Sequence, residues 1–134
     1  MPTLEEGFGC YSGVLGARRR TRALEVVSQK VRVSFLELAP GFYLELIAPT
    51  EGNTSLSRYL RNGLYHLCYL VDDLDRARAH LATHRFVPLP AFESEAFGFH
   101  RCQFFVSPQS HLVELCEMTA ESFEKFFAAQ LEIG

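Results

Sequence analysis

The stretch VSFLELAPGFYLEL at residues 33–46 recurs, with similar spacing of apolar residues, as CQFFVSPQSHLVEL at residues 102–115. Phe35 in the first copy aligns with Phe104 in the second, 69 residues further along. Each copy consists of two strand-like runs around a short turn, a pattern that predicts a β-hairpin. Self-similarity at a fixed offset indicates a duplicated structural unit.

The segment that precedes each hairpin is repeated as well. TLEEGFGCYSGVL at 3–15 aligns with DLDRARAHLATHR at 73–85, and apolar residues three and four positions apart predict a helix in both. The second helix follows a predicted strand, LYHLCYLV at 64–71, but the repeat places the equivalent strand of the first half upstream of Met1. The first half therefore lacks its opening strand in this sequence.

Three explanations of the missing strand stay open. The true start lies upstream, the gene has lost the strand, or another segment, for example from a partner chain, fills the gap. The first is slightly favoured, because a helix entered directly at Pro2 leaves little room before it. It implies a longer form with an additional upstream histidine and tighter binding of divalent metal.

Further elements complete an α+β architecture. Residues 23–28 and 86–92 predict strands, the latter restricted to a sheet edge by its two prolines. The C-terminal helix carries Phe123, Phe126, Phe127 and Leu131 on one side. We predict a single domain over residues 1–134 with module one at 1–50, a linker helix at 54–62, module two at 64–117 and the C-terminal helix at 119–131.

Composition excludes several classes of function. The chain has 134 residues, 48% of them hydrophobic, with a net charge of -3 and a pI near 5.9, unlike the basic surface of a nucleic-acid binder. RRRTR at 18–22 is its one basic run and is expected at a solvated turn or strand edge. We expect no membrane span and no signal peptide, four reduced cysteines and a cytoplasmic location.

Three ionisable residues stand among apolar neighbours in the predicted strands: Glu45, His66 and Glu114. The two glutamates align in the repeat. Because an unpaired buried carboxylate is costly, one interpretation is that the three side chains share a divalent metal. The other interpretation is a satisfied core histidine beside glutamates that face water. The residues alone leave both open.

The segment LELIAPTEGNTSLSRYLRNGLYHLCYLVDDLDRARAHL at 44–81, together with VELCE at 113–117, resembles methylmalonyl-CoA epimerases of the vicinal oxygen chelate superfamily. That superfamily also contains glyoxalase I, extradiol dioxygenases and bleomycin-resistance proteins. The resemblance extends over nearly the whole chain. It implies two βαβββ modules whose curved mixed sheet encloses a cleft, which agrees with the repeat.

The resemblance also implies a set of metal ligands. The family places them on the first and last strands of each module, which here correspond to Glu45, His66 and Glu114. The fourth ligand has no counterpart, because the opening strand is missing. The implied cofactor is a divalent ion such as Co, Ni, Zn, Mn, Fe or Mg, unless the incomplete set binds none.

Two functions follow from this resemblance. One is a metal-dependent epimerase, isomerase or lyase acting next to a carbonyl or thioester, with Glu114 or Glu45 as the catalytic base. The other is a non-catalytic binding or resistance-type protein with a degenerate metal site. Whether the chain is an enzyme therefore stays open, and we expect a small-molecule ligand and a homodimer. Candidate substrate contacts are Tyr43, Cys68, Phe97 and Phe99.

Overall fold

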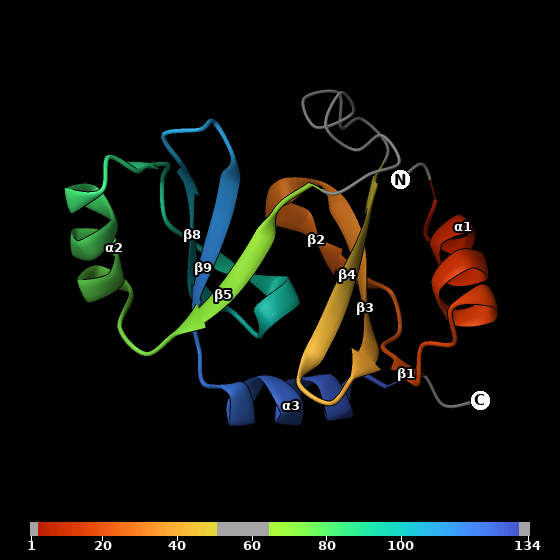
Figure 1. The fold of residues 1–134 in the computed structure, drawn as a ribbon. Helices are drawn as coiled ribbons and strands as arrows, with labels where there is room; N and C mark the ends of the chain where they lie inside the picture. Colours follow the sequence, from red (N-terminus) through yellow and green to blue (C-terminus); the bar gives the residue numbers. More distant parts are fainter. Residues whose placement is uncertain (1–2, 51–64, 132–134) are drawn as a thin grey trace. The chain divides into compact units, whose positions relative to one another are not determined.

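The computed structural model describes residues 3–50 and 65–131, which fall into two compact units (Figure 1). The first unit comprises Met1–Gly63 and Glu124–Gly134, and the second comprises Leu64–Phe123. The predicted linker helix at 54–62 lies outside the described residues. None of the described helices is both long and apolar enough to cross a bilayer.

The α+β class is confirmed, and each unit contains one sheet. The first unit has, in chain order, α1 (Leu4–Phe8), a π-helix (Gly9–Val14), β1 (Arg19–Arg20), β2 (Leu24–Val26), a 3₁₀ helix (Val27–Gln29), β3 (Val31–Ala39) and β4 (Phe42–Pro49). The second has β5 (Leu67–Val71), α2 (Leu74–Thr83), β6 (Val87–Pro88), β7 (Phe92–Ser94), a 3₁₀ helix (Glu95–Phe97), β8 (His100–Val106) and β9 (Leu112–Glu117). The last helix, α3 (Ala120–Ala129), begins in the second unit and continues into the first.

The two sheets share one plan, as the sequence repeat predicts. β3 pairs with β1, β2 and β4, and β8 pairs in the same way with β6, β7 and β9. Phe35 lies opposite Glu45 in the first sheet, and Phe104 lies opposite Glu114 in the second. The duplicated hairpins therefore have the same register.

One strand distinguishes the second sheet. β5 lies parallel to β9, so the sheet is mixed. Among the described residues of the first unit, β4 pairs only with β3, and no strand corresponds to β5.

A helix covers one face of each sheet. In the first unit, Leu4 of α1 packs on Leu36 and Leu46. In the second unit, Leu74 of α2 packs on Phe105 and Leu115. Because strand side chains alternate between faces, Glu45 and Glu114 lie on the opposite face of their sheets, away from these helices.

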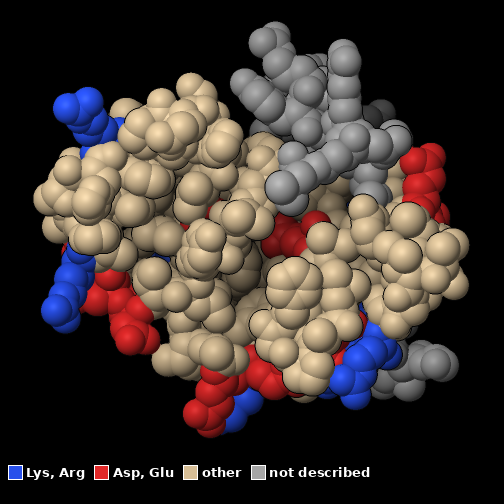
Figure 2. Space-filling view, in the orientation of Figure 1, with Lys and Arg blue, Asp and Glu red and all other residues tan. Residues whose placement is uncertain are grey.

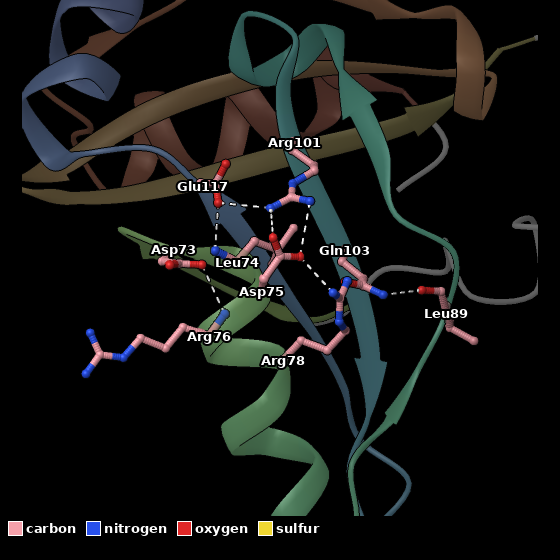
Figure 3. A network of polar contacts seen from close by, with 9 residues as sticks. All are labelled: Asp73, Leu74, Asp75, Arg76, Arg78, Leu89, Arg101, Gln103 and Glu117. Carbon is pink, nitrogen blue, oxygen red and sulfur yellow. Dashed lines mark hydrogen bonds and ion pairs between the residues drawn. The ribbon is translucent and has the colours of Figure 1, made fainter.

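Polar contacts fix the start of α2 (Figure 3). The Asp73 side chain accepts a hydrogen bond from the backbone N–H of Arg76, so Asp73 is the N-cap of α2. Glu117, at the end of β9, accepts from the backbone N–H of Leu74 at 2.7 Å and from Arg101 at 3.1 Å. These two contacts hold the pKa of Glu117 below its ordinary value. The carboxylate thus joins the helix to the sheet.

The C-terminal part of α3 is attached to the first sheet by charge. Arg19 of β1 donates two hydrogen bonds to Glu37, at 3.0 and 2.6 Å, and one to Glu124 of α3 at 2.7 Å. Beneath them, Phe127 is fully buried, with its ring centre 4.9 Å from the Arg19 guanidinium carbon. Acidic and basic side chains lie next to each other along the edge where Figure 1 draws α3 (Figure 2).

Three predicted elements differ in detail. The helix predicted at 3–15 is a short α-helix followed by a π-helix, and Leu15 is exposed rather than packed. The strand predicted at 64–71 begins at Leu67, so His66 immediately precedes it. The edge strand predicted at 86–92 is divided into β6 and β7, because proline interrupts strand pairing.

Replacing Leu74 by alanine tests the α2 core. Leu74 is fully buried, so we expect the free energy of unfolding to fall by about 2–5 kcal/mol, measured by chemical denaturation. Arg76→Ala on the exposed side of the same helix is the control, with an expected change within about 0.5 kcal/mol. Equal effects of the two changes would contradict this packing.

The Arg19 network predicts a specific response to acid. Hydrogen bonds to Arg19 and Tyr43 hold the pKa values of Glu37 and Glu124 below the ordinary 4.5. Their stabilisation is therefore present above about pH 4.5 and is lost as the pH falls through the folded-state pKa values. As the pH is lowered below about 4.5, the melting temperature of the native chain should fall more steeply than that of Arg19→Met. Arg22→Met, which loses contacts to Gln130 but to no carboxylate, should retain the native pH dependence.

Candidate functional site

The face of the second sheet opposite α2 carries the candidate functional side chains. Glu114 of β9 lies opposite Phe104 of β8 and opposite Cys68 of β5. Cys116, two residues after Glu114, lies on the same face and opposite Cys102. The alternation that directs Leu115 to α2 thus directs Glu114 to this face.

His66 lies next to Glu114. Its Nε2 atom is 3.1 Å from Oε1 of Glu114, and the two side chains are only 7% and 5% exposed. The ring meets Tyr65 and Phe104 edge-on, with centroid distances of 4.6 and 5.0 Å. Two ionisable groups are therefore held together in a largely apolar, aromatic environment.

The other ring nitrogen of His66, Nδ1, is buried and has no hydrogen-bond partner among the described residues. An imidazole whose Nε2–H donates to Glu114 carries a lone pair at Nδ1. A buried polar atom without a protein partner is costly, and an ordered water or a bound ligand would satisfy it. The His66–Glu114 pair therefore has an unused donor or acceptor available for chemistry.

The pair fits part of a metal site. Nitrogen and oxygen donors about 2.0–2.2 Å from one tetrahedral zinc ion are about 3.3–3.6 Å apart. The 3.1 Å separation in the His66–Glu114 pair is a few tenths of an ångström shorter than this spacing. Within residues 3–50 and 65–131, no three His, Cys, Asp or Glu side chains are arranged to hold an ion. The described pair supplies two donors.

Glu45 belongs to the first unit, where it is half-buried on the face of its sheet opposite α1. Tyr43 shares this face and donates a hydrogen bond to Glu124. Burial and this contact raise the pKa of Tyr43 to about 12. Glu45 as a metal ligand and Tyr43 as a substrate contact both stay predictions.

The other proposed substrate contacts differ in their surroundings. Phe97 is buried, with its ring centroid 5.9 Å from that of Phe123, whereas Phe99 is 65% exposed and has a φ of 64°. Cys68 is exposed on the edge strand β5. The structure therefore leaves Phe99 and Cys68 accessible to a ligand and places Phe97 in the core, and the three roles stay predictions.

The sequence did not reveal the acidic residues whose side chains connect one element of the fold to another. Glu37, Glu117 and Glu124 all have lowered pKa values because each binds arginine, a backbone N–H or tyrosine. Arg19 and Glu124 are 105 residues apart in sequence, so no local pattern connects them. Of these residues, Glu37 alone has a local signal in the sequence, because it stands among apolar residues in β3.

Comparison with known proteins identifies the family. The model of the Glyoxalase/Bleomycin resistance protein/Dioxygenase superfamily matches residues 2–106. The chain belongs to this superfamily. No curated protein matches the chain in sequence.

Solved structures share this superfamily fold. A hypothetical protein, BH1468 from Bacillus halodurans C-125, is 17% identical with a TM-score of 0.74, covering 89% of this chain and 88% of its own. Methylmalonyl-CoA epimerase from Mycobacterium tuberculosis is 24% identical with a TM-score of 0.68, covering 89% and 83%. A selenomethionine methylmalonyl-CoA epimerase is 22% identical with a TM-score of 0.70, covering 86% and 87%. At these identities the likeness shows the fold.

Thiol labelling tests the burial on the candidate face. Cys10 and Cys68 are exposed, whereas Cys102 and Cys116 are buried, and hydrogen bonding to Cys116 together with burial raises the pKa of Cys102. Because the thiolate is the reactive form, we expect two of the four thiols to react quickly in the native chain and all four after unfolding. Cys68→Ser should lower the native count by one. Rapid labelling of four native thiols would contradict the structure.

Proposed function

We propose that this chain is a metal-dependent epimerase, isomerase or lyase acting at a carbon next to a carbonyl or thioester. The observation that carries the proposal is the buried His66–Glu114 pair, with its 3.1 Å contact and an Nδ1 that has no hydrogen-bond partner in residues 3–50 and 65–131. Membership of a superfamily that includes glyoxalases supports it. The solved structures named as methylmalonyl-CoA epimerases suggest an acyl thioester as the first substrate to test.

In this proposal Glu114 is the base that removes the proton next to the carbonyl. The C–H electron pair moves into the carbonyl to form an enolate, and the carboxylate receives the proton. A proton from water then adds to the opposite face of the same carbon, and Glu114 releases its proton to water, which completes an epimerisation. The position of Glu114, 5% exposed and 3.1 Å from Nε2 of His66, favours this role.

The donor set favours a divalent cofactor. A bound Co, Ni, Zn, Mn, Fe or Mg ion would stabilise the negative charge that develops on the substrate oxygen. His66 and Glu114 are the ligands that we propose from the described geometry, and Glu45 as a third ligand stays a prediction. Nitrogen and oxygen donors do not select sharply among these ions.

A second function is a non-catalytic binder, and the aromatic surroundings of His66 favour it. Phe104 meets His66 edge-on and stacks on Phe92 at a centroid distance of 5.7 Å and an angle of 19°. Stacked aromatic side chains suit a flat or apolar ligand. A protein of this kind would bind its ligand without changing it.

Self-association also stays a prediction. Among the described residues, β5 pairs only with β9, and it exposes Leu67 and Tyr69 by 54% and 55%. An unprotected edge strand with exposed apolar side chains favours pairing with another chain.

Proton exchange and metal binding together test the proposed enzyme. With cobalt-loaded protein in D₂O, methylmalonyl-CoA should acquire deuterium at its α-carbon. Mass spectrometry measures the rate of this exchange. Glu114→Gln should lower this rate by about a hundredfold or more, because it removes the base. His66→Ala should also weaken Co²⁺ binding in equilibrium dialysis, and Glu45→Gln tests the third ligand.

The control is Glu93→Gln, an exposed carboxylate on β7, which should change neither exchange nor Co²⁺ binding. If His66→Ala and Glu114→Gln bind Co²⁺ as tightly as the native chain, the proposed metal site is wrong. If the native chain binds the metal and the thioester without exchange, the binding function replaces the enzyme.

A further inference from the structure

A pair of imidazoles lies on α2, on its exposed side. His80 is in the last turn of the helix, and His84 is the residue at its C-terminal cap. Both side chains are exposed, and their ring centroids are 4.8 Å apart with an angle of 64° between the rings. Neither belongs to the core under α2, which involves Leu74, Ala77 and Leu81.

The spacing of this pair is suited to chelation. Residues four positions apart lie above one another on a helix, so both rings project from the same side. A zinc ion binds imidazole nitrogen at about 2.0–2.1 Å, so two nitrogens on one tetrahedral ion are about 3.3 Å apart. Rings with centroids at 4.8 Å reach that separation by side-chain rotation, which exposure permits.

We propose that His80 and His84 form a surface site for a divalent transition metal, held by one nitrogen from each ring. Imidazole suits Zn²⁺, Cu²⁺ and Ni²⁺, and water would occupy the remaining positions. The carboxyl end of a helix carries partial negative charge, which favours a cation there. Nearby Arg76 and Arg85 oppose it, so we expect moderate affinity.

This site is separate from the His66–Glu114 pair and does not depend on the proposed enzyme function. A bound ion would connect the last turn of α2 to its cap and limit fraying of the helix end. Such an ion would also add to the metal content of the purified chain. A metal-binding measurement on this protein should therefore find two classes of site with different ligands.

Isothermal titration with Zn²⁺ tests the proposal in the full-length His66→Ala variant, which removes a ligand of the other site. We expect about one equivalent of Zn²⁺ to bind. Adding His80→Ala or His84→Ala should each raise the Kd at least about tenfold, because either change leaves a single imidazole. His111→Ala, another exposed histidine, is the matched control and should leave the Kd unchanged.

A second measurement locates the ion. Substoichiometric Cu²⁺ should broaden the ring resonances of His80 and His84 before those of the other histidines. Zn²⁺ should also raise the melting temperature, and either alanine variant should abolish that increase. A Kd unchanged by both alanine variants, a loss in only one of them, or first broadening at His111 would overturn the chelate.

Discussion

The two-residue period of the paired strands is the constraint on which both cores and the candidate site depend. In β9, Leu115 faces α2 while its neighbours Glu114 and Cys116 face the other side. A slip of one residue in the β8–β9 register would place the Glu114 carboxylate under the helix and Leu115 in the candidate site. Such a slip is prohibited by the cost of burying that charge in the core. The same strand register therefore places Leu115 in the core and Glu114 in the candidate site.

Glu37, Glu117 and Glu114 bind different partners. These partners indicate which carboxylates have a structural role and which one we propose for function. Glu37 binds Arg19, and Glu117 binds Arg101 and a backbone N–H. Arginine is protonated at all physiological pH values, so these glutamates stay charged and fixed. Glu114 instead faces His66, and an imidazole can donate, accept or bind a metal. This adaptable partner is the reason that we propose Glu114, and not Glu37 or Glu117, as the reactive carboxylate.

Elements with local signals could be predicted from the sequence, whereas contacts between distant segments could not. The hairpins at 33–46 and 102–115 follow from alternation and from their repetition, and the Asp73 cap follows from local hydrogen bonding. The family resemblance implied that His66 and Glu114 lie near each other, and their side chains are in contact. The link between Arg19 and Glu124 could not be predicted, because it joins residues from opposite ends of the chain.

The two units inherit the same hairpin but differ in what lies beside its last strand. Phe35 opposes Glu45 as Phe104 opposes Glu114, so each repeat presents one carboxylate beside an aromatic ring. In the second unit, the parallel strand β5 follows directly after His66 and so holds an imidazole next to that carboxylate. No described strand does this in the first unit. Duplication thus supplied two equivalent carboxylates, and the parallel strand gives one of them its imidazole partner.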